Sequence, residues 1–156
     1  MKRPLFLALA AVLLAAAPAN PVTWKLTNAG AKPLKAGDRF AVQLTASVQE
    51  GWHFYSMKQV DEGPVPTRIW LADNQPFQLA APVRGEEPEV VEDPTLHMEI
   101  EEYQGSAVFS LPLKVASTAV AGSYKLLVNA QTQSCNDHMC LPPATAKVEL
   151  PITIGK

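Results

Sequence analysis

The feature that most constrains the fold is a hydrophobic pattern that repeats every second residue along much of the chain. In residues 39–48, RFAVQLTASV, and in residues 123–132, SYKLLVNAQT, apolar side chains alternate with polar or small ones. Successive side chains of an extended strand point to opposite faces, so such a segment can bury one face and leave the other in water. The pattern therefore predicts β-strands. Outside the N-terminal residues, no segment has the length and the spacing of about 3.6 residues that would indicate a helix.

Six further segments are also typical of strands, and glycine, proline and acidic residues between them favour turns. Two of them are long, residues 106–115 and 145–154, and the shorter ones are 23–27, 52–57, 67–72 and 99–103. About eight strands, spaced by about ten residues, are typical of an antiparallel β-sandwich. The fold class predicted from this pattern is therefore all-β.

Two features interrupt the regular pattern. Residues 82–102, PVRGEEPEVVEDPTLHMEIEE, are acidic and contain prolines, so we expect a long irregular loop there. Pro112 and Pro151 lie inside strand-like segments. Proline cannot donate a hydrogen bond to a neighbouring strand, so we expect both on edge strands or at bulges.

The first 19 residues have the layout of a cleavable secretory signal peptide. Lys2 and Arg3 precede an uncharged apolar run at residues 5–17, and small residues follow it. The run is too short to cross a bilayer comfortably, so export fits better than a retained N-terminal anchor. We therefore expect residues 1–19 to be removed and residues 20–156 to form a single domain outside the cytoplasm.

The charge of the chain argues against one class of partner. The whole chain of 156 residues has a formal net charge of −2, and removal of Lys2 and Arg3 would make it more negative. No basic run is present in the sequence. Nucleic acid is therefore not expected as a partner.

The only two cysteines, Cys135 and Cys140, lie between two predicted strands. In an extended chain their Cα atoms would be about 16 Å apart, given about 3.3 Å per residue, whereas a disulfide requires about 4.4–6.8 Å. If they bond, the chain must turn between them. Asn136 and Asp137 favour such a turn, which would join a strand ending near Gln133 to one beginning near residue 144.

The residue pattern alone leaves three chemistries open for this pair. A structural disulfide closing a ring of about six residues would contribute only about 2.2 kcal/mol by the chain-entropy estimate, which weakens that hypothesis without removing it. A redox-active pair needs a reachable thiol on a short loop. The third possibility is a Cu(I) site, because thiolate, thioether and imidazole ligands suit that ion, and His-Met pairs occur at residues 97–98 and 138–139.

The segment around the cysteines resembles that of a known family. Residues 131–143, QTQSCNDHMCLPP, are similar to the active-site segment of the N-terminal periplasmic domain of DsbD-type thiol:disulfide interchange proteins. Three other segments resemble further parts of that domain, and the resemblance spans about residues 22–154. They are TWKLTN (23–28), GWHFYSMKQVDEGPVPTRI (51–69) and EEYQGSAVFSLPLKV (101–115).

The resemblance implies an immunoglobulin-like sandwich that carries a redox-active pair. By position this pair is Cys135 and Cys140. The family pattern implies that Cys140 forms the mixed disulfide with partners and that Cys135 resolves it. The protein would then act as a thiol:disulfide oxidoreductase of the protein-disulfide reductase type. No cofactor and no resident metal are implied.

The resemblance also implies partners and a location. Electrons would pass from one thioredoxin-fold protein to others in the periplasm, where the outcome is reduction of incorrect disulfides or of cytochrome-maturation components. Because this chain ends at Lys156, we expect the electron donor to be a separate protein. A separate membrane electron-transfer protein is one candidate source of these electrons. We expect the domain itself to be a monomer.

Two groups of residues are expected to support the pair. In residues 52–55, strand alternation places Trp52 and Phe54 on one face, toward the core, and His53 and Tyr55 on the other face, where they can meet the cysteine loop. The family's cap loop corresponds to Asp93, Leu96, His97 and Met98.

Charged neighbours are expected to tune the thiolate. His53 or His138, when protonated, would favour a thiolate. Asp137 would oppose it, because like charges disfavour each other.

Overall fold

The computed structural model describes residues 20–28, 33–93 and 97–156, and in that part of the chain it has twelve β-strands and no helix. Each of the eight segments expected from the sequence contains a strand. The strands are β1 (Val22–Asn28), β2 (Arg39–Val48), β3 (His53–Tyr55), β4 (Arg68–Leu71), β5 (Phe77–Leu79), β6 (Arg84–Gly85), β7 (Glu89–Asp93), β8 (Met98–Gln104), β9 (Ser106–Val115), β10 (Gly122–Thr132), β11 (Ser134–Cys135) and β12 (Ala144–Ile154).

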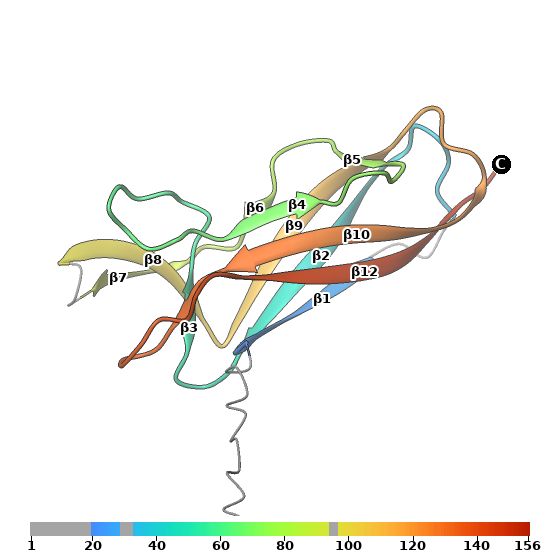
Figure 1. Cartoon of the computed structure of the whole chain (residues 1–156). Helices are drawn as coiled ribbons and strands as arrows, with labels where there is room; N and C mark the ends of the chain where they lie inside the picture. Colours follow the sequence, from blue (N-terminus) through green and yellow to red (C-terminus); the bar gives the residue numbers. More distant parts are fainter. Residues whose placement is uncertain (1–19, 29–32, 94–96) are drawn as a thin grey trace, which may run out of the picture.

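The strands form a β-sandwich, as the sequence predicts, with a smaller sheet at one end (Figure 1). One layer has the order β1-β2-β9-β5, with β6 also paired to β9, and the other has the order β12-β10-β4. The smaller sheet has the order β11-β3-β8-β7. All named strand pairs are antiparallel.

The core lies between the two layers and continues under the smaller sheet. Alternate residues of β2 and β9, such as Leu44 and Phe109, face Leu126 of β10 in one buried cluster. Phe54 of β3 and Tyr103 of β8 join this cluster, with their ring centroids 5.2 Å apart. The smaller sheet is therefore anchored to the sandwich by aromatic packing, which fixes the position of β3 relative to the rest of the domain.

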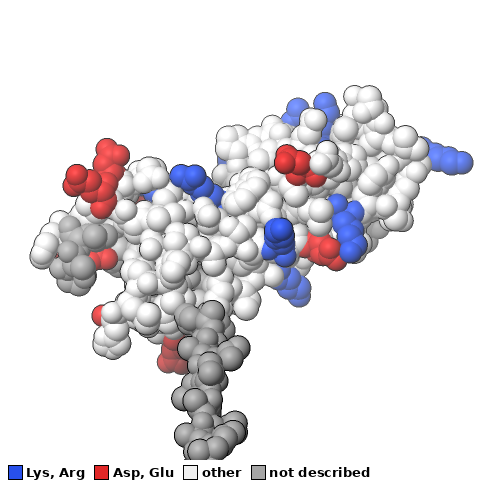
Figure 2. Space-filling model, in the orientation of Figure 1, with Lys and Arg blue, Asp and Glu red and all other residues white. Residues whose placement is uncertain are grey.

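The long acidic stretch is not the irregular loop that we expected. Residues 84–85 form β6, residues 89–93 form β7, and β8 begins at residue 98. β8 covers the segment 99–103 that was expected to be a strand, whereas β7 has three charged residues and a single inward-facing apolar side chain, Val91, which is too little to reveal a strand by periodicity. This end of the molecule is acidic, whereas most of the visible Lys and Arg side chains lie over the opposite half (Figure 2).

The two strand prolines have different outcomes. Pro151 lies on β12, an edge strand, as expected. Pro112 lies on β9, which is an inner strand, so the expectation of an edge position was wrong. Its carbonyl oxygen accepts a hydrogen bond from the N–H of Ala80, so its nitrogen faces the gap between β5 and β6, where no strand needs a donor.

The predicted signal peptide, residues 1–19, lies outside the described residues. In the described part of the chain, no helix is long and apolar enough to cross a membrane.

Candidate functional site

The cysteines lie at one end of the smaller sheet, where β10 has ended and β12 has not yet begun. Cys135 ends β11 and pairs with His53 of β3 across the sheet. Its sulfur is bonded to that of Cys140, with an S–S distance of 2.08 Å and a Cα–Cα distance of 4.0 Å. The chain turns between the two cysteines, as predicted, and β12 starts at Ala144.

Asn136 organises the turn between the cysteines. Its side-chain Oδ1 accepts hydrogen bonds from the N–H groups of His138 and Met139, both at 2.9 Å. Its own N–H donates to the carbonyl of Met139 at 2.9 Å. Asparagine is suited to this role because its short side chain can replace a backbone acceptor in a turn. The loop is therefore a compact ring closed by the disulfide.

The two cysteines differ sharply in exposure. Cys135 is only 2% exposed and packs against Tyr55 and Ile100, with Val91 and Met98 at the edge of this small cluster. Cys140 is exposed to solvent. A thiol arriving from outside can therefore reach Cys140 directly, whereas Cys135 is shielded by its neighbours.

A pocket of about 410 Å³ opens beside the disulfide. The sheet contributes His53 and Tyr55, β7 contributes Asp93, and the cysteine loop forms one wall. Two other loops contribute Gly63, Pro64 and Gln133, and the cysteine loop contributes all of its residues from Cys135 to Cys140.

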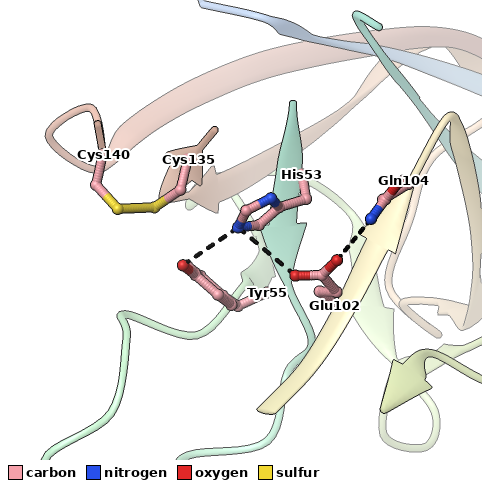
Figure 3. Close-up of polar contacts among 6 residues, drawn as sticks. All are labelled: His53, Tyr55, Glu102, Gln104, Cys135 and Cys140. Atoms are coloured by element: carbon pink, nitrogen blue, oxygen red, sulfur yellow. Dashed lines mark hydrogen bonds and ion pairs between the residues drawn. A yellow bond between two sulfur atoms is a disulfide. The ribbon is translucent and has the colours of Figure 1, made fainter. Parts of the chain in front are cut away.

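A chain of polar side chains leads from Tyr55 and His53, beside the disulfide, to Glu102 and Gln104 (Figure 3). The Nε2 atom of His53 is 3.4 Å from the hydroxyl of Tyr55 and 3.6 Å from Oε2 of Glu102. The other carboxylate oxygen of Glu102 accepts a hydrogen bond of 2.7 Å from Nε2 of Gln104. Strand pairing explains the arrangement, because His53 lies opposite Gln104 and Tyr55 lies opposite Glu102.

Tyr55 keeps its proton over a wide pH range. Burial, with the nearby negative charges of Asp93 and Glu102, raises the pKa of its hydroxyl from 10.0 to about 12. The hydroxyl is therefore a hydrogen-bond donor at neutral pH.

The structure brings most of the predicted site residues together. His53 and Tyr55 both face the cysteines, as strand alternation implies, and Phe54 between them is fully buried in the main core. Trp52, which was expected to share the core with Phe54, is only half-buried and lies before β3. Asp137 and His138 are exposed on the loop and line the pocket.

The expected cap loop is only partly at the site. Asp93 lines the pocket, and Met98 packs beside Cys135 and Tyr55. His97 is exposed, has a positive φ of 53° and does not line the pocket. Leu96 lies outside the described residues.

Glu102 and Gln104 were not predicted as site residues from the sequence. Both lie in a run of acidic and polar residues that gives no sign of a buried carboxylate. The signal that identifies them is the register of β8 against β3, which periodicity does not provide. Gly63, Pro64 and Gln133 were also missed as wall residues, and a hydrogen bond of 3.0 Å from the N–H of Val65 to Oε1 of Gln133 holds their two loops together.

The geometry adds no support for the Cu(I) hypothesis. Among residues 20–28, 33–93 and 97–156, no group of three or more His, Cys, Asp or Glu side chains is arranged to hold a metal ion. Both sulfurs are engaged in the disulfide, and His97 does not line the pocket that His138 lines.

Comparison with known proteins gives a family and a fold. Residues 24–152 match the family described as the N-terminal part of the thiol:disulfide interchange protein DsbD. The crystal structure of the N-terminal periplasmic domain of ScsB from Proteus mirabilis is similar, with a TM-score of 0.57 and 14% sequence identity over 87% of this chain. This chain covers 49% of that one, about half its length.

Two further comparisons are uninformative about function. A family 123 glycoside hydrolase from Clostridium perfringens aligns with a TM-score of 0.38 and 9% identity, over 85% of this chain and 27% of the other, which is too weak to carry an argument. No curated protein sequence matches this chain.

Proposed function

Because this chain belongs to the family of the N-terminal domain of the thiol:disulfide interchange protein DsbD, we propose that it is a thiol:disulfide exchange module. Cys135 and Cys140 are its redox pair. It accepts two electrons from one thioredoxin-fold protein and passes them to another.

The observation that carries this proposal is the unequal exposure of two bonded cysteines. Both cysteines line the pocket, but Cys140 is exposed to solvent whereas Cys135 is buried. Exchange requires that one sulfur be open to attack and that the other be held ready to leave and return. The ring is also too small to be an effective brace, at about 2.2 kcal/mol by the chain-entropy estimate.

The first step is attack by a donor thiolate on the sulfur of Cys140. A bond forms between the donor sulfur and Cys140 while the bond to Cys135 breaks, and the electron pair leaves on the sulfur of Cys135. The second thiol of the donor then attacks the donor sulfur and releases Cys140. The donor ends as a disulfide, and this domain ends with two thiols, having gained two electrons and two protons.

The second half of the cycle runs in the opposite direction. Cys140, as a thiolate, attacks the disulfide of an acceptor and forms a mixed disulfide with it. Cys135 then attacks Cys140, which reforms the ring and releases the reduced acceptor. The nucleophile is therefore Cys140 and the resolving residue is Cys135.

The partners and the location follow from the family rather than from the geometry. The similar domain of ScsB is a periplasmic one, and the N-terminal residues of this chain have the layout of a signal peptide. We place the module in the periplasm after removal of residues 1–19. Its acceptors there are thioredoxin-fold proteins, including those of cytochrome maturation, and its donor is a separate protein.

Trapping with single-cysteine variants tests the proposal. Cys135→Ser keeps only the exposed thiol, and Cys140→Ser keeps only the buried one. Each variant is mixed with a thioredoxin that lacks its resolving cysteine and carries a thionitrobenzoate group on the other, and release of thionitrobenzoate is followed by absorbance. We expect Cys135→Ser to form the mixed disulfide at least about 100-fold faster, because only its thiol is reachable.

Two results would contradict the proposal. Equal rates for the two variants would show that exposure does not select the nucleophile. A wild-type bridge that stays closed in a large excess of reduced thioredoxin would show an inert structural disulfide instead.

A further inference from the structure

Glu102 is a charged side chain in an unusual place. Its residue is only 4% exposed, on a strand that also buries Ile100 and Tyr103 and leaves Glu99 and Gln104 exposed. Burial of a carboxylate is costly unless a hydrogen-bond donor or an opposite charge compensates it. Gln104 provides a donor for one oxygen at 2.7 Å, and His53 is 3.6 Å from the other.

His53 is the link between this carboxylate and the disulfide. On one side of β3 it pairs with Cys135, and on the other side it pairs with Gln104. Its ring lies between the cysteine and the carboxylate, with the hydroxyl of Tyr55 at 3.4 Å (Figure 3). The imidazole can therefore contact Glu102 and face Cys135 at the same time.

We infer that Glu102 is a positioning residue that holds His53 beside Cys135, so that His53 supplies the positive charge and the proton that the departing Cys135 sulfur requires. This inference rests on the proposed function. It adds a role for two residues that the exchange reaction alone does not specify.

The need for such a group follows from where the charge forms. When a donor thiolate attacks Cys140, the electron pair moves to Cys135, which is buried and poorly reached by water. A protonated imidazole stabilises that thiolate and then transfers its proton to the sulfur, which leaves a neutral His53 and a Cys135 thiol. Glu102 keeps the ring in place through the transfer.

The other charges around the site make the imidazole more important. Asp93 and Asp137 line the same pocket, and their negative charges disfavour a thiolate at Cys135. His138 also lines the pocket, but it is exposed on the loop, where water screens its charge. Tyr55 can donate a hydrogen bond and cannot supply a positive charge.

The test compares Glu102→Gln with a matched control, Glu101→Gln, in the full chain. Both variants remove one negative charge from neighbouring positions of β8, but Glu101 contacts Ser56 and Lys58 instead of the site. The disulfide is opened with dithiothreitol between about pH 5 and pH 8, the range in which imidazole titrates. The rate is divided by the concentration of the reductant thiolate at each pH.

The wild-type rate per thiolate should be higher at the acid end of this range than at the alkaline end, because only a protonated imidazole can supply the proton to the departing sulfur. Glu102→Gln should lower this rate on the order of tenfold near pH 6, because the displaced imidazole of His53 no longer acts as the acid. The rate per thiolate of this variant should also depend less on pH. Glu101→Gln should keep the wild-type profile. An unchanged profile in Glu102→Gln would overturn the inference.

His53→Gln makes the test independent of whether the Glu102 variant folds. It should show the same loss and the same flat profile, and Glu102→Gln should add no further loss in the His53→Gln background, because one residue acts through the other. A wild-type profile in His53→Gln, or two losses that multiply, would overturn the inference. If neither dithiothreitol nor reduced thioredoxin opens the wild-type disulfide, the proposed function is overturned as well. If the wild-type disulfide opens and all the variants open at the wild-type rate, only the inference about Glu102 and His53 is overturned.

Discussion

At the scale of single residues, Tyr55 shows how the site combines packing with chemistry. It lies on the face of β3 opposite to Phe54, and it packs against Cys135 and Ile100. Its hydroxyl is close to His53 and in the field of two carboxylates. One side chain thus covers the buried sulfur with its ring and presents a proton donor at the same time.

The titration of Tyr55 is a direct test of this environment. The chain has three tyrosines, so the difference between the wild-type protein and Tyr55→Phe isolates one of them. We expect the tyrosinate absorbance that is lost in Tyr55→Phe to have a midpoint near pH 12, because burial and two negative charges raise this pKa from 10.0 to about 12.

The same shift has a consequence for stability. In the unfolded chain Tyr55 ionises near its ordinary pKa of 10.0, whereas the folded chain keeps the proton until about pH 12. The contribution of protonated Tyr55 to the free energy of unfolding is therefore complete below pH 10 and is lost as pH rises toward about 12. A midpoint near pH 10 in protein that is still folded by circular dichroism would contradict this description of the site.

The residues of the site could be predicted only in part. Alternation in residues 52–55 placed His53 and Tyr55 on the face toward the cysteines, because a strand has two faces and Phe54 occupies the core. Glu102 could not be found in this way, because its burial depends on which residue of β3 it lies opposite. That register is a property of two distant segments and of the turns that fix them.

At the scale of elements, the loop from Cys135 to Cys140 is held by more than its disulfide. Three hydrogen bonds between Asn136 and the backbone of residues 138–139 keep the loop in its closed shape. They hold the two cysteines near each other, which favours closure of the ring over two separate thiols.

Removal of the Asn136 side chain should make the bridge easier to reduce. The substitution removes two hydrogen bonds on an exposed loop, each contributing about 0.5 kcal/mol at the low end of the usual range, and a total loss of about 1 kcal/mol corresponds to roughly a fivefold change in an equilibrium constant. We expect Asn136→Ala to shift the equilibrium with a glutathione buffer toward the dithiol by roughly this factor. Asn136→Asp, which retains the acceptor oxygen, should lie closer to the wild-type protein, and an Asn136→Ala equilibrium identical to wild type would rule out this role.

The long strands could be predicted well from the sequence, and so could the segments that contain the short strands β3 and β4, whereas β5, β6, β7 and β11 could not. β2 and β9 coincide with the expected segments because their alternation runs for ten residues. β6 and β11 have two residues each and cannot show a period. β7 is an edge strand of the smaller sheet with exposed acidic residues, so its composition resembles that of a loop.

At the scale of the whole molecule, the bridge is peripheral to what holds the fold together. The main core joins both layers of the sandwich and includes Phe54 and Tyr103 from the smaller sheet, but it includes neither cysteine. The sequence separation of the bridged residues is five, so the bond restrains little of the unfolded chain. The domain should therefore remain folded when the bridge is open.

Complete reduction should lower the melting temperature only modestly. A ring of this size contributes about 2.2 kcal/mol by the chain-entropy estimate, which corresponds to a shift of less than about 10 °C for a domain of this size. At 25 °C, about 20 °C or more below the melting temperature of an ordinary domain, the reduced wild-type protein should keep the far-ultraviolet circular dichroism spectrum of the oxidised protein. The double variant with serine at both cysteines should keep it too. Loss of that spectrum on reduction would identify the bridge as a structural brace.

The burial of Cys135 also limits how many molecules the domain can serve at one time. In the proposed exchange, the one exposed cysteine can form a mixed disulfide with only one partner at a time, so the electron donor and the electron acceptor must bind in alternation and no ternary complex lies on the route. Steady-state kinetics with both substrates varied should then give parallel double-reciprocal lines, and each substrate in excess should inhibit by occupying the form of the domain that the other one needs.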